Sequence, residues 1–315
     1  MRGEEAKVKA LRIVGIALSL AGLVFFIAAF ARSPEVLIQA AVAPFFWSSL
    51  LIGTAAIFCS LLLAAFNWHM LLGVFGAGRT LALVGPVFLS TQIGKYLPGN
   101  VGHLIGRAVM LKSYEISVGA STKAMIVETM ALLCVGFALA AMLLHEWVVK
   151  ALQVMGDSMW LAIVLLSIAV VAMATTLAFR GRTAPFIRQL LADLAASRSR
   201  LLVVGAIDLV NFALNGLALW SAAALLFPDR QIGMLACLGV ASASFLAGYI
   251  TPGSPGGIGV REATTVLLLN PVFSATEAAM LALLIRLAAT LADLIGFALG
   301  IALLALRGNR IVLRD

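Results

Sequence analysis

Charged residues are scarce in this sequence, and their scarcity limits the class of protein. Only 11% of the 315 residues are Asp, Glu, Lys or Arg, whereas a soluble domain carries roughly 25%. No polar stretch is long enough to form a soluble domain. Hydrophobic residues make up 63% and the mean hydropathy is +1.09. Apolar segments of about 20 residues, enough to cross a bilayer core of roughly 30 Å, recur from end to end. The sequence therefore predicts an all-α polytopic membrane protein.

Motifs for metal binding and nucleotide chemistry are also absent. The three cysteines, Cys59, Cys134 and Cys237, are scattered through apolar segments without metal-ligand spacing. The sequence has neither a G-x-x-x-x-G-K-[ST] loop nor an H-E-x-x-H motif, and its three histidines are isolated. We therefore expect no enzymatic activity, no cofactor and no metal site. The net charge is +8. We interpret the excess of basic residues as setting the orientation of the chain in the membrane and contacting lipid headgroups, so we expect no nucleic-acid partner.

Apolar segments of spanning length define the predicted topology. The first follows a charged lead and is longer than the apolar region of a cleaved signal, so we predict that it is retained. The predicted full spans are 12–31, 45–66, 119–144, 160–179, 201–227 and 277–306. Two further apolar regions, 82–112 and 232–269, are each interrupted by a Pro-Gly cluster.

The distribution of Lys and Arg indicates how the two interrupted regions run. Segment 180–200 contains five arginines, and cytoplasmic loops are enriched in such residues. This segment and both termini lie in the cytoplasm together only if each interrupted region enters and leaves the membrane on one side. The charges therefore predict two re-entrant hairpins, cytoplasmic termini and an external loop at 145–159. Residues 183–200 suit either an interfacial helix on anionic lipid or a solvated linker.

The two interrupted regions are related in sequence. "PGNVGHLIGR" at 98–107 and "PGSPGGIGVR" at 252–261 share the frame P-G-x-x-G-x-x-x-x-R. Each follows two predicted spans and precedes a third, so an odd number of crossings inverts the second copy. We predict a single integral membrane domain of two inverted repeats, each with three transmembrane helices and one re-entrant Pro-Gly hairpin. The first repeat is 1–150 with its hairpin at about 82–112, and the second is 151–315 with linker 180–200 and its hairpin at about 232–269.

Proline and glycine explain how a chain can break at membrane depth. Proline ends the incoming half-helix, and glycine permits positive φ and close approach of a backbone or a ligand. We assign this role to Pro98, Gly99, Gly102, Pro252, Gly253, Gly256, Gly257 and Gly259. The next half-helix starts with unpaired N–H groups that can hold phosphate, beside Arg107 in one copy and Arg261 in the other. Ordinary spans with Pro-Gly kinks are the alternative.

Ionisable residues inside the predicted spans and hairpins are candidates for function, because each costs roughly 2.5–3.5 kcal/mol at the bilayer centre. Four cations balance four anions in these segments, which suits a zwitterionic or singly anionic headgroup. They are Lys95, Arg107, Arg261 and Arg286, and Glu128, Asp208, Glu262 and Asp293. We predict a substrate-binding set of Lys95, Arg107, Glu128, Arg261, Glu262 and Arg286. Arg286 and Glu262 are expected to approach each other or a shared headgroup. Asp208 and Asp293 are the charges best explained as structural, and ion pairs that merely join helices are the alternative for the others.

At "IGKYLPGNVGHLIGR" and "TPGSPGGIGVREA" the sequence resembles the lysylphosphatidylglycerol synthase transmembrane family, along nearly its whole length. That family includes the flippase domain of bacterial multiple-peptide-resistance proteins, and the resemblance implies movement of a lipid headgroup between leaflets. It also implies that the predicted binding residues line a central cavity together with six of the turn residues, Pro98, Gly99, Pro252, Gly256, Gly257 and Gly259. The sequence ends at Asp315 without an aminoacyl-transferase domain, so we expect no synthesis of lysylphosphatidylglycerol. Glu128-Thr129 stands where the family pattern suggests a Glu-Arg pair.

These observations predict a lipid flippase or scramblase in the bacterial inner membrane. Its expected partner is a membrane lipid with an anionic or zwitterionic headgroup, and a homo-oligomer or an envelope-biosynthesis partner is compatible with the sequence. Two alternatives stay open. The chain could be a non-transporting partner of an envelope glycosyltransferase or polysaccharide machine, or a transporter of a small soluble anion.

Overall fold

The computed structural model describes residues 42, 45–97, 101–145, 184–251 and 255–312. Within these ranges every regular element is a helix, and the described residues include no strand. The prediction of an all-α protein is therefore confirmed.

Four helices are long and apolar enough to cross a membrane: α3 (Phe46–Val74), α6 (Val118–Leu143), α10 (Arg198–Leu226) and α13 (Ala275–Val312). They coincide with four predicted spans, and the other two, 12–31 and 160–179, lie outside the described residues. Helix α3 continues beyond the predicted end at 66. The reason is that Asn67 and Trp68 are buried, and the Asn67 amide donates to Asp208 Oδ1 at 2.8 Å.

Both interrupted regions break where the Pro-Gly clusters predict. The first comprises α4 (Leu81–Thr91), the 3₁₀ turn η1 (Gln92–Tyr96) and α5 (Gly102–Lys112). The second comprises α11 (Met234–Ile250), the 3₁₀ turn η2 (Pro255–Gly257) and α12 (Val260–Leu269). Leu97 and Thr251, which precede prolines, have extended backbones with ψ of 149° and 114°, as expected from the clash between proline and a helical predecessor.

Three of these helices are too short to cross a bilayer. Helices α4 and α5 have 11 residues and α12 has 10, which corresponds to about 15–17 Å at 1.5 Å per residue. A bilayer core measures roughly 30 Å. Short helices on both sides of a break are compatible with hairpins, and the re-entrant path stays a prediction.

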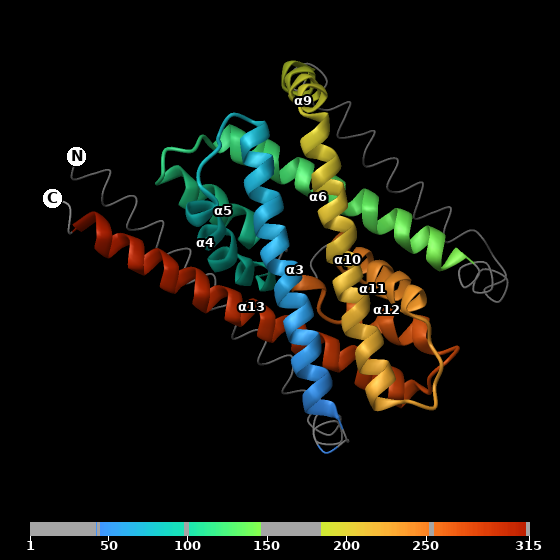
Figure 1. Cartoon of the computed structure of the whole chain (residues 1–315). Helices are drawn as coiled ribbons and strands as arrows, with labels where there is room; N and C mark the ends of the chain where they lie inside the picture. The colour runs from blue at the N-terminus through green and yellow to red at the C-terminus, as the bar shows by residue number, and fades with distance from the viewer. Residues whose placement is uncertain (1–41, 43–44, 98–100, 146–183, 252–254, 313–315) are drawn as a thin grey trace.

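Helices from the two halves of the chain pack on one another around a central pair of helices, α3 and α10. Helix α3 packs along α10. In Figure 1, α4 and α5 lie on one side of that pair, and α11 and α12 lie on the other. The long helix of each half contacts the broken region of the other half, since α13 packs on α4 and α6 packs on α11. The turns η1 and η2 also touch each other. The two breaks therefore meet inside the protein.

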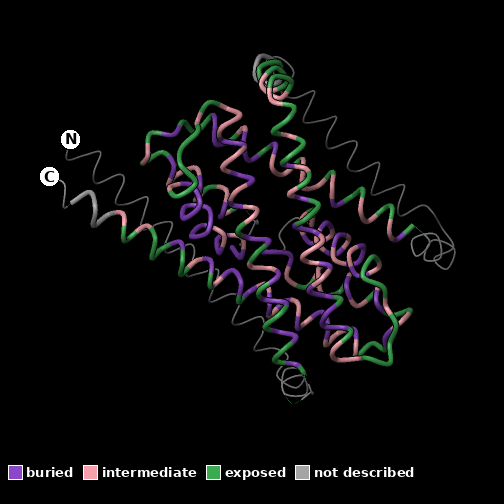
Figure 2. Tube along the Cα trace, in the orientation of Figure 1, coloured by how far each residue is buried: buried purple, intermediate pink, exposed green. Residues whose placement is uncertain are grey.

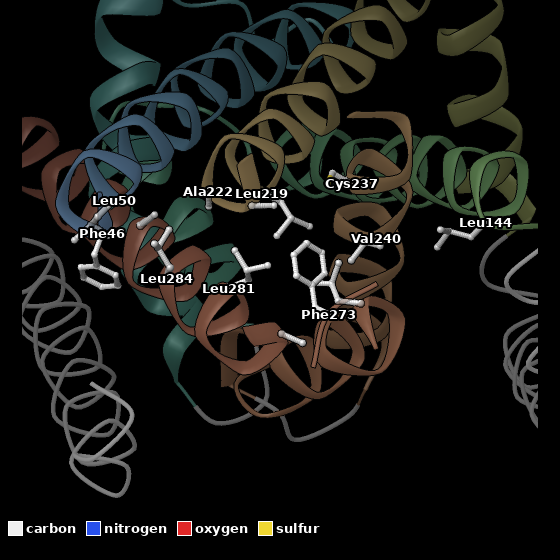
Figure 3. Packing of buried hydrophobic residues seen from close by; sticks show 14 residues of the cluster. Phe46, Leu50, Leu144, Leu219, Ala222, Cys237, Val240, Phe273, Leu281 and Leu284 are labelled. Carbon is white, nitrogen blue, oxygen red and sulfur yellow. The ribbon is translucent and has the colours of Figure 1, made fainter. Parts of the chain in front are cut away.

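Two apolar clusters hold this arrangement. Figure 3 shows Phe273 among side chains of α10, α11 and α13, including Leu219, Val240 and Leu281. The second cluster joins α3, α4, α5, α6 and α10, with Trp68 at 0% exposure. Figure 2 shows exposed residues along much of α6, where large apolar side chains face outward, as expected of a helix in contact with lipid. Its outward side chains include Ile126, Met130, Phe137 and Met142.

Segment 184–196 forms helix α9 (Ala184–Ala196). Leu190 and Leu194 pack against the second cluster, and Asp193 pairs with Lys123 of α6 at 2.9 Å. Helix formation favours the interfacial-helix interpretation of this segment over the solvated linker.

Candidate functional site

A cavity of about 250 Å³ lies where the two broken regions meet the long helices. Its walls come from both halves of the chain, and each of its lining residues is buried or half-buried. The predicted substrate-binding residues all line it: Lys95, Arg107, Glu128, Arg261, Glu262 and Arg286. Asp293 joins them, whereas Asp208 is bound to Asn67 between α3 and α10. The structure thus brings together the six side chains that were chosen from sequence.

Arg107 of α5 forms the first ion pair. Its Nη1 lies 2.7 Å from Glu128 Oε2 on α6, and its Nη2 donates to Gln92 Oε1 at 3.0 Å. The guanidinium carbon lies 3.8 Å from the centroid of the Phe88 ring, within the range of a cation–π contact. Arg107 is only 2% exposed. Its charge is therefore neutralised and its orientation is held by several partners.

Lys95 forms the second pair. Its Nζ lies 2.7 Å from Asp293 Oδ2 on α13. The same oxygen accepts a hydrogen bond from the Tyr96 hydroxyl at 2.6 Å. Asp293 thereby ties the turn η1 to a long helix of the other half, which fits the structural role expected for it.

Arg286 and Glu262 form the third pair. Arg286 Nε lies 3.3 Å from Glu262 Oε1, so the predicted approach of these two residues is confirmed. Arg286 Nη1 also donates to the backbone carbonyl of Gly256 at 2.9 Å. One guanidinium therefore joins α13, the turn η2 and α12. Breaking such a buried pair on one side typically costs about 3–5 kcal/mol.

One N–H group at the start of α12, that of its N-cap Gly259, is bonded within the protein, and the N–H groups of residues 260–262 stay the predicted anion site. Glu262 Oε2 accepts the Gly259 N–H at 2.6 Å, in a capping-box arrangement. The Glu262 carboxylate thus takes one of the four N–H groups at this helix end. Arg261 does lie in the first turn of α12, but Arg107 is the sixth residue of α5 and lies beyond the first turn.

Arg261 differs from the other cations of the cavity. Within the described part of the chain it forms no ion pair, and its buried Nε has no hydrogen-bond acceptor. Its guanidinium carbon lies 4.5 Å from the Phe245 ring centroid. The stem of the side chain lies so close to Gly248 and Gly257 that a Cβ on either would collide with it. Arg261 is therefore held in place by packing while its charge is unneutralised.

The glycines of the second break have the backbone that was expected. Gly256, Gly257 and Gly259 have φ of 57°, 74° and 84°, a region that L side chains rarely adopt. Gly102 packs against the backbone of Gly94 so closely that no side chain fits between them. The other four predicted turn residues, Pro98, Gly99, Pro252 and Gly253, lie outside the described residues.

Sequence reasoning missed several polar and aromatic residues of the site. Gln92, Phe245 and Tyr249 line the cavity, and Tyr96 bonds Asp293. Phe245 and Tyr249 are four residues apart and stack at 5.5 Å, a spacing visible in the sequence, but apolar context hides its meaning. Among the described residues, no three His, Cys, Asp or Glu side chains are grouped as a metal site requires.

Comparison with known proteins gives one family. Residues 12–296 match the sequence model of the lysylphosphatidylglycerol synthase TM region. The match includes both interrupted regions and the charged cavity. A search of curated proteins finds no match.

Proposed function

The chain belongs to the lysylphosphatidylglycerol synthase TM family, and we propose that it moves a phospholipid or another lipid-linked headgroup between membrane leaflets. The observation that carries this proposal is the cavity, which holds seven charged side chains inside a bundle of membrane-spanning length. A headgroup would enter this polar cavity while its acyl tails stay in the bilayer. The proposal covers flippase and scramblase activity and involves no catalytic step.

The energetics of membrane insertion support a transport role for the cavity. A charge at the bilayer centre costs roughly 2.5–3.5 kcal/mol on insertion scales, so intramembrane charges persist mainly where they pair or line a pathway. Three pairs with N–O distances of 2.7, 2.7 and 3.3 Å offset this cost on the cavity wall. The charged and amide side chains of the wall border a space of about 250 Å³, which is suited to a headgroup.

The packing of the two halves supports the proposed inverted repeats. A two-fold axis between the repeats would place α3 beside its equivalent, α10. It would also relate the contact between α4 and α13 to the contact between their equivalents, α11 and α6. These are the contacts that the helices make. In known transporters, such repeats meet at interrupted helices near the bilayer midplane. We propose the same arrangement here, with re-entrant breaks, cytoplasmic termini and a location in the bacterial inner membrane.

Reconstitution tests the proposal. Purified protein is inserted into vesicles that contain a trace of acyl-labelled fluorescent phosphatidylglycerol, and dithionite is added outside to quench the exposed label. Lipid movement predicts that quenching proceeds beyond the outer-leaflet fraction when protein is present, and stops there in vesicles with heat-unfolded protein.

The same vesicles separate the two alternatives. Uptake of a small phosphate-containing solute without lipid movement would identify an anion transporter. Movement of neither, by protein that passes a folding check, would overturn the proposal and favour a non-transporting partner role.

A further inference from the structure

In the part of the cavity wall that the structure describes, positive charges outnumber negative charges by one. Its ionised side chains, with His103 counted as neutral, are the cations Lys95, Arg107, Arg261 and Arg286 and the anions Glu128, Glu262 and Asp293. Three cations are matched to the three carboxylates by the pairs described above. Arg261 is left over.

The surplus charge is only partly accessible to water, because Arg261 is half-buried. Phe245, Gly248 and Gly257 pack around the Arg261 side chain, and its Nε is buried. An unmatched charge in a poorly hydrated site is unfavourable, and an anion that enters the site recovers part of this cost. A guanidinium also offers two parallel N–H groups to a phosphate, which adds a geometric preference to the electrostatic one. The cavity is therefore prepared for a single anionic group.

Each carboxylate of the wall is already occupied. Glu128 accepts from Arg107, and Asp293 accepts from Lys95 and Tyr96. Glu262 contacts Arg286 and accepts the Gly259 N–H. An ammonium group on the headgroup would find no unmatched carboxylate in the part of the wall that the structure describes. The predicted spans outside the described residues add no carboxylate, because 160–179 contains no ionisable residue and 12–31 contains only Arg12.

Uncharged polar groups complete the lining. Gln92, Thr129, Asn211 and Asn215 reach the cavity. The Oδ1 atom of Asn211 is buried and has no hydrogen-bond donor among the described residues. The amide and hydroxyl groups of this lining can bond the hydroxyl groups of a headgroup.

We infer that the cavity selects a lipid with a monoanionic phosphodiester headgroup that carries hydroxyl groups and no ammonium group. The phosphodiester lies at Arg261, and the hydroxyl groups lie among the uncharged polar side chains of the lining. Zwitterionic and aminoacylated lipids are disfavoured because their ammonium groups meet three engaged carboxylates and one unmatched cation. This inference rests on the proposed function and specifies the substrate class of the same site.

The test compares three lipids on the unaltered protein. Vesicles contain acyl-labelled phosphatidylglycerol, phosphatidylethanolamine or lysylphosphatidylglycerol, whose net charges are negative, zero and positive. We expect phosphatidylglycerol to move about tenfold faster than either of the others, which corresponds to roughly 1.4 kcal/mol of discrimination. Equal rates, or faster movement of a lipid with an ammonium group, would overturn the inference while leaving the proposed function intact. Movement of none would instead count against the proposed function.

Arg261 variants connect the preference to the residue. Arg261→Gln should bring the rates for phosphatidylglycerol and phosphatidylethanolamine together, and Arg261→Glu should favour the cationic lipid. Arg230→Gln is the matched control, because Arg230 is 47% exposed, pairs with Glu277 and lies outside the cavity. An unchanged preference in folded Arg261→Gln would contradict the assignment.

A competition experiment needs no variant and separates two sources of the same chemistry. Soluble glycerophosphoglycerol is added to the unaltered protein, and bound labelled phosphatidylglycerol is followed by native mass spectrometry. Retention of the lipid identifies a lipid headgroup site, as proposed. Displacement at equimolar concentration would show that the free phosphodiester is the ligand and would overturn the lipid assignment.

Discussion

Replacing Gly256 with alanine adds one carbon at the point where the two interrupted regions meet. Gly256 has φ 57° and ψ 18°, and a left-handed backbone costs an L residue about 1–2 kcal/mol. The added Cβ would also lie 2.9 and 3.0 Å from Cδ1 and Cε1 of Tyr96. The ring has little room to move, because Tyr96 is 2% exposed and its hydroxyl is bonded to Asp293. Overpacking of this kind costs about 1–3 kcal/mol. Gly256→Ala should therefore lower the free energy of unfolding by about 2–5 kcal/mol.

Gly76 offers a matched control for the backbone contribution. It follows α3 with φ 69°, and a Cβ built there has no neighbour within 4 Å. Gly76→Ala should cost only the left-handed strain, about 1–2 kcal/mol. Both variants are measured by denaturant titration of detergent-purified protein, and the difference between them gives the cost of the contact with Tyr96.

A second background isolates the ring. Tyr96→Val removes both ring carbons that the added methyl would meet. In that background, Gly256→Ala should cost no more than Gly76→Ala does. Equal costs for Gly256→Ala with and without the ring would refute the reasoning, because the two turns would then not pack as the structure has them.

Three further predictions follow from individual side chains. Arg107→Gln should cost about 3–5 kcal/mol in the same unfolding assay because Glu128 loses its partner; Arg107→Gln/Glu128→Gln should recover part of the loss, and purely additive losses would contradict the pairing. Asp208→Asn keeps an acceptor for its amide partner on α3 and should cost less than Asp208→Leu, which leaves that amide with only the Val204 carbonyl and one N–H unpaired, at about 1–3 kcal/mol; equal costs would exclude this role. Cysteines introduced at Lys150 and Arg180 should react with an impermeant thiol reagent from opposite sides of the membrane, and labelling of both from outside would exclude the re-entrant topology.

Span positions were predictable from sequence because length and apolarity determine them. Helices α6, α10 and α13 begin within three residues of the predicted starts. The predicted end of α3 was wrong because polar residues at 67–69 resemble a membrane boundary. In the folded protein Asn67 is 2% exposed and finds Asp208 on another helix. Sequence shows the polarity of a residue but not the partner that permits its burial.

The charged residues of the site were predictable as a set, and their pairing only in part. Arg286 and Glu262 lack neighbours on their own helix faces, and this isolation correctly predicted their approach. The partners of Lys95 and Arg107 depend on which helices pack together, and several carboxylates were compatible with each. The capping of Gly259 by Glu262 could have been anticipated, since a carboxylate three residues after an N-cap is a capping-box pattern.

The two halves share a backbone frame but distribute their charges differently. In the first half the short helix carries the cation Arg107 and the long helix the anion Glu128, whereas in the second half the short helix carries Glu262 and the long helix Arg286. This reversal leaves Arg261, the sequence equivalent of Arg107, without a carboxylate among the described residues. A fully matched wall would hold cations and anions equally poorly. Two or more unmatched cations would raise the cost of keeping the cavity empty in the membrane, because each buried charge carries its own desolvation penalty. One unmatched cation is therefore the smallest departure from neutrality that still distinguishes the sign of a headgroup.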